Sequence, residues 1–153
     1  MLWVTRQKPH VDRCASAWLI KRFIDKDATF QFVTKEQKIP KGAIGFTLPK
    51  AKIRPIEGVK TTFDVLIEKY NVKDPIVLWI KDLIRDYEFN EENPEKMRLK
   101  ETIGICYVLK GLEKTSQTEA ETVAKALIVM DAFYATLKDL TSASTLISLE
   151  KSN

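Results

Sequence analysis

The sequence predicts a single domain of the α+β class, in which a small N-terminal βαβ-like unit with two or three short strands packs on a C-terminal bundle of about four helices. Strand-like and helix-like segments alternate only near the start of the chain, and the second half follows helical periodicity throughout. With 153 residues, 44% of them apolar, the chain is long enough to bury a core without a disulfide or a metal.

The N-terminal unit is expected from three consecutive segments. Residues 2–5 are apolar and β-branched and predict a strand, and residues 29–33 alternate as a second strand. Between them we expect a helix over 13–25, with Asp12 as its N-cap. Strand, helix and strand in this order are typical of a βαβ unit with parallel strands.

A long loop is expected to follow this unit. Residues 34–60 are rich in Pro, Lys and Gly and contain one further predicted strand, at 43–48. Loops of this length inside a compact domain are often functional.

The remainder of the chain is expected to be helical. Asp74 followed by Pro75 marks an N-cap with proline at the first helical position, and the third of the four helices is expected to stop near Gly111. We expect the domain to span 1–141, and residues 142–153, which show no partner pattern, to fray. The helices are expected at 61–70, 74–87, 94–112 and 118–140.

A single His and two Cys exclude the common metal centres and catalytic triads. Structural zinc sites need four Cys or His ligands, and a Ser/His/Asp triad would have to use His10. Cys14 and Cys106 are expected to be free thiols. The sequence has no glycine-rich phosphate-binding motif. We expect no membrane span and no secretory signal, and therefore a cytoplasmic location.

The net charge of +4 hides an asymmetry along the chain. Residues 1–60 contain 13 basic and 5 acidic side chains, whereas residues 61–153 contain 12 and 16. A basic front half favours an anionic partner, such as a nucleic acid, a phosphorylated metabolite or a small oxyanion. The alternative is that these lysines form a solvated face.

Two arginines occupy unusual positions in the predicted first helix. This helix is apolar nearly all round, and Arg13 and Arg22 project between apolar neighbours. A buried guanidinium needs a carboxylate or an anionic ligand, because an unpaired buried charge is very unfavourable. The alternative is that the aliphatic stems of both side chains reach the surface.

A carboxylate interrupts the apolar face of the last predicted helix. Asp131 lies among apolar side chains three and four residues away, so we expect it to be ion-paired, or protonated with a raised pKa. Arg13 and Arg22 are the candidate partners. The pair could belong to a ligand site, or it could be a purely structural link between the basic front and the helical back.

Weaker candidates lie elsewhere. His10 and Asp12 could help to bind a metal, or His10 could act as a base, although a turn residue and a helix cap have the same pattern. Asp64 fits a capping box, and Arg85 is expected on the solvent side of its helix. Cys14 lies near a helix N-terminus and basic residues, which lower thiol pKa values, although a buried small side chain is the alternative.

Six blocks between residue 3 and about residue 137 resemble the chromate-resistance domain family of the ChrB type. They are W-V-T-R at 3–6, P-H-V-D-R at 9–13, W-L-I-K-R-F-I-D at 18–25, F-D at 63–64, L-I-R at 83–85 and D-A-F-Y at 131–134. Seven polar residues fall on motif positions of that family: Arg6, Asp12, Arg13, Arg22, Asp64, Arg85 and Asp131.

The resemblance implies a function. The family is associated with chromate resistance, and its members are described as regulators or accessory proteins, often encoded beside a chromate transporter. We therefore expect a regulatory or accessory domain that binds a small oxyanion. A cleft with Arg6, Arg13 and Arg22 would suit chromate, sulfate or phosphate, because arginine forks match tetrahedral oxyanions.

The sequence departs from the family pattern at two places. Family members often carry a His just before a Gly, and a Cys two residues before the F-D block. Those places here are Glu57, which we add to the candidate ligand-binding residues, and Thr61. The acidic residue that follows the family's I-V-R block corresponds to Glu88. Many relatives also carry a further N-terminal domain, whereas this chain starts at the motif.

A second function class stays open at this point. A small enzyme acting on an anionic substrate could use a metal at Asp12, Asp64 or Asp131, or Cys14 as a redox thiol. We assign no cofactor, no metal site and no catalytic residue. The expected partners are the small anion and either another protein or a second copy of this chain. DNA has weaker support, because no helix-turn-helix is recognisable.

Overall fold

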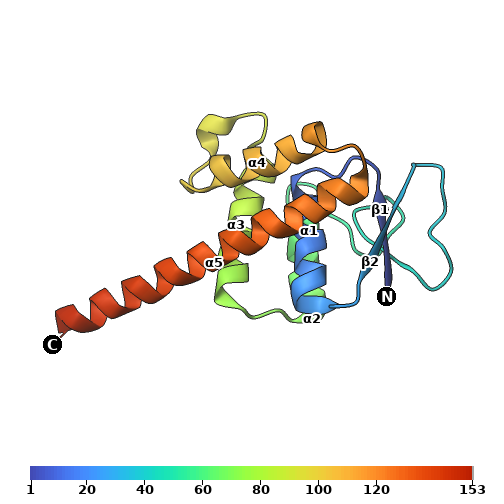
Figure 1. The fold of residues 1–153 in the computed structure, drawn as a ribbon. Helices are drawn as coiled ribbons and strands as arrows, with labels where there is room; N and C mark the ends of the chain where they lie inside the picture. The colour runs from blue at the N-terminus through green and yellow to red at the C-terminus, as the bar shows by residue number, and fades with distance from the viewer. Residues whose placement is uncertain (153) are drawn as a thin grey trace.

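A three-stranded parallel sheet with helices packed on one face forms the framework of the computed structural model (Figure 1). The structure describes residues 1–152, apart from the side chains of 145–147 and 149. The predicted α+β class is confirmed. None of the described helices is long and apolar enough to cross a membrane.

The predicted βαβ unit is present, and its strands run parallel. Strand β1 (Leu2–Arg6) pairs with β2 (Thr29–Val33) along its whole length, with Leu2 opposite Thr29 and Arg6 opposite Val33. Helix α1 (Val11–Leu19) connects them and continues into a π-helical turn, Ile20–Ile24, which ends where the helix was expected to end. The start differs from the prediction, because His10 occupies the N-cap position and Asp12 lies inside the helix.

The long loop covers the other face of the sheet. Strand β3 (Ile44–Gly45) is shorter than the predicted 43–48, and it pairs with β1 so that the strand order is β2-β1-β3. Alternate side chains of β1 point to opposite faces. Trp3 packs in the core with the helices, whereas Val4 packs with Leu48 of the loop in a second small core.

Two of the C-terminal helices begin at the capping residues that the sequence predicts. Thr61 and Asp64 form a reciprocal capping box, and Asp74 accepts hydrogen bonds from the first turn that follows Pro75. The helical elements after the loop are α2 (Thr62–Tyr70), α3 (Pro75–Asn90), the 3-10 turn η2 (Pro94–Lys96), α4 (Thr102–Thr115) and α5 (Glu119–Ser152).

The third predicted helix begins later than expected because of a set of hydrogen bonds to Asp86. The Asp86 carboxylate accepts hydrogen bonds from the backbone N–H of Arg98 and Leu99 and from the Thr102 hydroxyl, at 2.8–3.1 Å. These bonds hold residues 97–101 in an irregular loop, so that only η2 and α4 are helical in this region.

The ends of three helices also differ from the prediction. Helix α3 continues past 87 to Asn90, and α4 passes through Gly111, since an isolated glycine is tolerated within a helix. Helix α5 extends well past 140. The expectation that residues 142–153 fray stays a prediction, and residue 153 lies outside the described residues.

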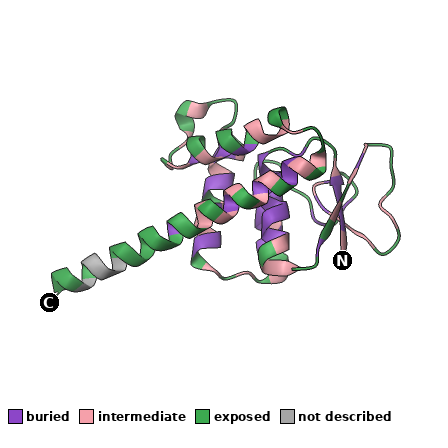
Figure 2. Ribbon diagram, viewed as in Figure 1, coloured by how far each residue is buried: buried purple, intermediate pink, exposed green. Residues whose placement is uncertain are grey.

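Helix α1 is the centre of the core. It contacts α2, α3, α4 and α5, and eight of its nine residues are buried, which confirms a helix enclosed on nearly all sides (Figure 2). Its most exposed position is Arg13, one of the two arginines that the sequence placed among apolar neighbours.

Asp131 of α5 is ion-paired with Arg22, one of its two expected partners. The pair has hydrogen bonds of 3.0 Å from Arg22 Nε and 2.8 Å from Arg22 Nη2, and the buried Trp18 indole N–H donates to the same carboxylate at 2.9 Å. The side chains of Arg22 and Asp131 are 40% and 44% exposed, so the expected burial is wrong. The hydrogen bond from Arg22 lowers the pKa of Asp131, so the alternative of a protonated Asp131 with a raised pKa is wrong.

We predict that Asp131→Ala destabilises the protein by about 2 kcal/mol, because the buried indole N–H of Trp18 loses its acceptor. Arg22→Ala should lower the free energy of unfolding by less than about 1 kcal/mol, because the ion pair itself is solvent-exposed. Urea unfolding of both variants tests this difference. Equal losses would show that the ion pair, and not the Trp18 bond, joins α5 to α1.

Candidate functional site

The candidate site lies beyond the carboxyl ends of the parallel strands, the usual place for ligands in such sheets. Two hollows meet there. The Glu88 cavity, of about 290 Å³, is lined by residues that include His10, Asp12, Arg13, Glu57, Thr61 and Glu88. The Arg6 hollow, of about 480 Å³, is lined by residues that include Arg6, Lys8, His10, Arg13, Lys35 and Glu36.

Arg13 lies in the wall of both hollows. Its Nη1 donates to the Lys8 carbonyl at 3.3 Å, but its Nε is buried without a hydrogen-bond partner among the described residues. Burial and the nearby charge of Arg6 lower the pKa of Arg13, while Asp12 and Glu88 oppose this shift. The guanidinium is therefore held in place with part of its donor capacity unused.

Arg6 is the last residue of β1 and approaches Arg13 from the sheet side. Within residues 1–152 it forms no ion pair with a carboxylate. Two guanidinium groups thus face the same hollow, and Lys8 and Lys35 add positive charge around them. A tetrahedral anion is the kind of ligand that such an arrangement can bind.

Asp12 caps helix α2 instead of its own helix. Its Oδ2 accepts the backbone N–H of Thr62 at 2.8 Å, and its Oδ1 accepts that of Phe63 at 3.1 Å and the Ser16 hydroxyl at 3.3 Å. Burial raises the pKa of Asp12, and the two N–H donors oppose that rise. Because both oxygens are occupied, Asp12 is a structural residue of the cavity wall.

Glu88 connects α3 to the start of α1. Its Oε1 accepts the backbone N–H of Asp12 at 3.2 Å. Burial, followed by the charge of Asp12, raises the pKa of Glu88 to about 7. The family pattern alone gives Glu88 only as the counterpart of an acidic position. It lies four residues after the buried Ile84, and this position on the apolar stripe could have identified it.

Asp64 and Arg85 lie behind the Glu88 cavity. The Asp64 carboxylate accepts the backbone N–H and the hydroxyl of Thr61, at 2.8 and 3.0 Å. Arg85 Nη1 approaches Asp64 Oδ1 at 3.4 Å, and its Nη2 donates to the Val59 carbonyl. Both residues position the loop that forms this wall. Arg85 was expected on the solvent side of its helix, but its guanidinium contacts Asp64 and Val59.

The two places where the sequence departs from the ChrB-type pattern line the same cavity. Glu57 is exposed at its rim, and Thr61 lies in its wall with its hydroxyl bonded to Asp64. His10, whose side chain is 64% exposed, borders both hollows and lies 3.4 Å from Glu113. The structure thus assembles most of the predicted site residues in one region.

Other candidates do not join this region. Arg22 follows Arg13 by nine residues along one helix, a rise of about 13 Å, and is paired with Asp131. The prediction that Arg6, Arg13 and Arg22 line one cleft is therefore wrong for Arg22. The Cys14 thiol donates to the Pro9 carbonyl at 3.5 Å, and burial raises its pKa to about 12 instead of lowering it. Among the described residues, no cluster of three His, Cys, Asp or Glu could hold a metal.

The match to a known family extends over most of the chain. A family model described as "ChrB, C-terminal domain" matches residues 3–137. The chain belongs to this family. Protein ChrB of Cupriavidus metallidurans is 40% identical to it over 72 residues, which are 47% of this chain and 22% of that protein. No solved structure matches the chain.

We predict that Asp12→Ala lowers the free energy of unfolding of this ChrB-family domain by about 3 kcal/mol. The substitution leaves the buried N–H groups of Thr62 and Phe63, in the first turn of α2, without an acceptor. Urea unfolding measures the effect, with Asp27→Ala in an exposed turn as the control. A loss below about 1 kcal/mol would contradict this structural role.

We also predict that Glu88→Gln changes the pH dependence of stability. Between about pH 4.5 and about pH 7 the native state binds more protons at Glu88 than the unfolded chain does, so the contribution of Glu88 to stability falls as pH rises. The glutamine variant should therefore gain stability relative to the wild type over this range, by on the order of 3 kcal/mol. Chemical unfolding at pH 5, 6, 7 and 8 tests this, and a constant difference would contradict it.

Proposed function

We propose that this ChrB-family domain is a regulatory or accessory component of chromate resistance that binds a small oxyanion between Arg6 and Arg13. The family's association with chromate resistance gives the biological context. The observation that carries the proposal is the buried Arg13 Nε, which has no partner among the described residues and lies beside a second guanidinium.

The physical argument starts from the unused donors of Arg13. A desolvated donor without an acceptor is unfavourable by about 1–3 kcal/mol. An anion beside the part of the guanidinium that lines the hollows would offset this cost through its attraction to the charge of the whole group. Arg6 and the N-terminus of α1, whose partial positive charge points to the same region, add to the attraction. Lys8 supplies a third cation at the edge of the Arg6 hollow. Chromate, sulfate and phosphate have the charge and the tetrahedral oxygens that suit this arrangement.

The second function class receives less support from the geometry. A redox enzyme would need a reactive thiol, but Cys14 is buried and its thiol is strongly held in the protonated form. A metal-dependent enzyme would need free carboxylates, but the oxygens of Asp12 and Asp64 accept backbone N–H groups at helix starts.

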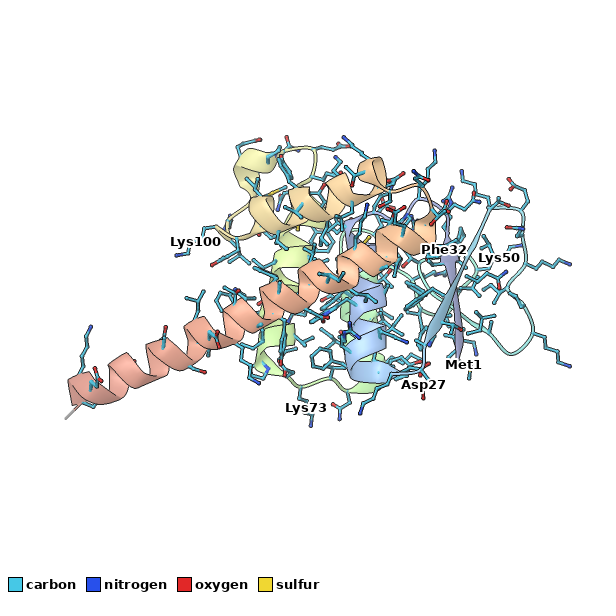
Figure 3. All side chains as sticks on the ribbon, in the orientation of Figure 1. Met1, Asp27, Phe32, Lys50, Lys73 and Lys100 are labelled. Carbon is cyan, nitrogen blue, oxygen red and sulfur yellow. The ribbon has the colours of Figure 1, made fainter. Side chains whose placement is uncertain are left out.

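The macromolecular partners stay predictions. The loop after β2 is basic, and its residues Lys35, Lys38, Lys41 and Lys50 are exposed. Figure 3 labels Lys50 in this loop. Such a surface suits an acidic protein or a nucleic acid backbone. A homo-oligomer is the third expectation from the sequence.

We predict that isothermal titration with sodium chromate, sulfate or phosphate at low ionic strength gives saturable binding with at least one of the three anions. Arg13→Ala should weaken it ten- to a hundredfold, because a charge-assisted hydrogen bond is worth about 1.5–3 kcal/mol. Arg13→Lys should recover only part of the affinity, since lysine cannot present a fork.

Arg22→Ala is the matched control for this experiment. It removes an arginine from the same helix, but one that lies outside both hollows and is paired with Asp131. Binding that is lost in Arg22→Ala, or kept in Arg13→Ala, would contradict the assignment. The absence of heat with all three anions would end the proposal.

A further inference from the structure

We infer that Glu88 selects the protonation state of the bound anion: a dianion enters the Glu88 cavity only with one proton, shared between the ligand and the Glu88 carboxyl group. The inference rests on the proposed role of Arg13 in oxyanion binding, and it concerns an anion that reaches this guanidinium from the Glu88 cavity, the second of the two hollows that Arg13 lines. It is carried by the position of the half-buried Glu88 carboxylate in the same cavity wall as Arg13, whose Nε has no hydrogen-bond partner among the described residues.

The two oxygens of Glu88 have different surroundings. Oε1 accepts the backbone N–H of Asp12 at 3.2 Å, which fixes the carboxyl group at the start of α1. Oε2 forms no hydrogen bond within the described part of the chain, and Glu88 lines the cavity. A ligand that reaches Arg13 from this cavity therefore meets an available carboxyl oxygen of Glu88.

The charges around the cavity make a proton necessary. Asp12, directly behind Glu88, is a further carboxylate, and its charge acts on Glu88 in the same direction as burial. If Glu88 were ionised when a dianion binds, the dianion and the carboxylates of Glu88 and Asp12 would lie together in one desolvated region. Carboxylates in such a situation share a proton instead of both ionising. Burial first, and the charge of Asp12 second, already raise the pKa of Glu88 to about 7 before any anion is present.

Other titratable groups face Glu88 and have to be separated from it. His10, Arg13, Glu57 and Lys60 line the same cavity. Asp12 on α1, Tyr87 and Glu91 on α3 and Cys106 on α4 act on Glu88 or respond to its charge. Of these, His10 lines both hollows, and its contribution is separated from that of Glu88 by a variant of its own.

The proton balance of the step is simple. A proton from solvent binds to the Glu88 carboxylate, and the resulting O–H donates to an oxygen of the anion, while Arg13 donates to another. No covalent bond of the anion is broken. Sulfate is the best probe, because it carries no proton near neutral pH and every proton taken up must bind to the protein.

The experiment is calorimetric titration of sulfate into the full chain in buffers of different ionisation enthalpy, between pH 6 and pH 8.5. We expect uptake of nearly one proton per sulfate at pH 8, little uptake at pH 6, and an affinity that falls about tenfold per pH unit above pH 7. Glu88→Gln, which keeps an acceptor for the Asp12 N–H, should abolish the uptake and bind sulfate at least tenfold more tightly than wild type at pH 8.5.

Two variants serve as controls. His10→Gln should keep the proton uptake at pH 8, and Glu57→Gln removes a charge from the cavity rim without removing the buried carboxyl group, so it should keep the uptake as well. Uptake that is lost in His10→Gln but kept in Glu88→Gln would assign the proton to His10 and overturn the inference.

The outcomes separate this inference from the proposed function. Saturable sulfate binding to the wild type without proton uptake overturns the role of Glu88 and leaves the oxyanion site standing. No sulfate binding at any pH overturns both. If Glu88→Gln fails to fold, the wild-type uptake at pH 8 compared with that of His10→Gln still decides the question.

Discussion

The hydrogen bonds that Asp12 makes with the start of α2 are the contact on which the rest of this domain depends. A carboxylate on the central helix replaces the missing acceptors at the N-terminus of another helix, 50 residues further along the chain. The same residue offers its own backbone N–H to Glu88 on α3. One residue thus fixes three helices relative to each other. The region that it organises is also where the two hollows meet.

Much of the fold follows from local patterns in the sequence, and the site follows only in part. The capping residues Thr61 and Asp74 and the alternation at 29–33 predict elements that the structure confirms, because their signals lie within a few residues of one another. The late start of α4 depends on Asp86, whose partners lie 12–16 residues away. Likewise, Asp12 has the pattern of a local cap, and only the tertiary structure shows which helix it caps.

The arginines illustrate the same limit. Helical periodicity identifies Arg13 and Arg22 as two equivalent charged residues on one apolar helix. It also identifies Asp131 as a carboxylate on an apolar face that needs a cationic partner. It cannot show that nine residues of helix separate the two arginines into different environments. Arg22 forms a partly exposed ion pair with Asp131, whereas Arg13 has a buried donor, Nε, without a partner among the described residues. Helical periodicity therefore locates the unusual charges, and their pairing in the structure decides which of them could bind a ligand.

The position of Arg13 between the two hollows has a consequence for how they fill. A guanidinium has five donor hydrogens in a fixed plane. Donors of Arg13 that bind a ligand in one hollow are therefore not available to a ligand in the other hollow. The hollows are in this sense two compartments with a common wall. If a ligand in one hollow changes the affinity of the other hollow for its ligand by some factor, then the second ligand must change the affinity for the first by the same factor.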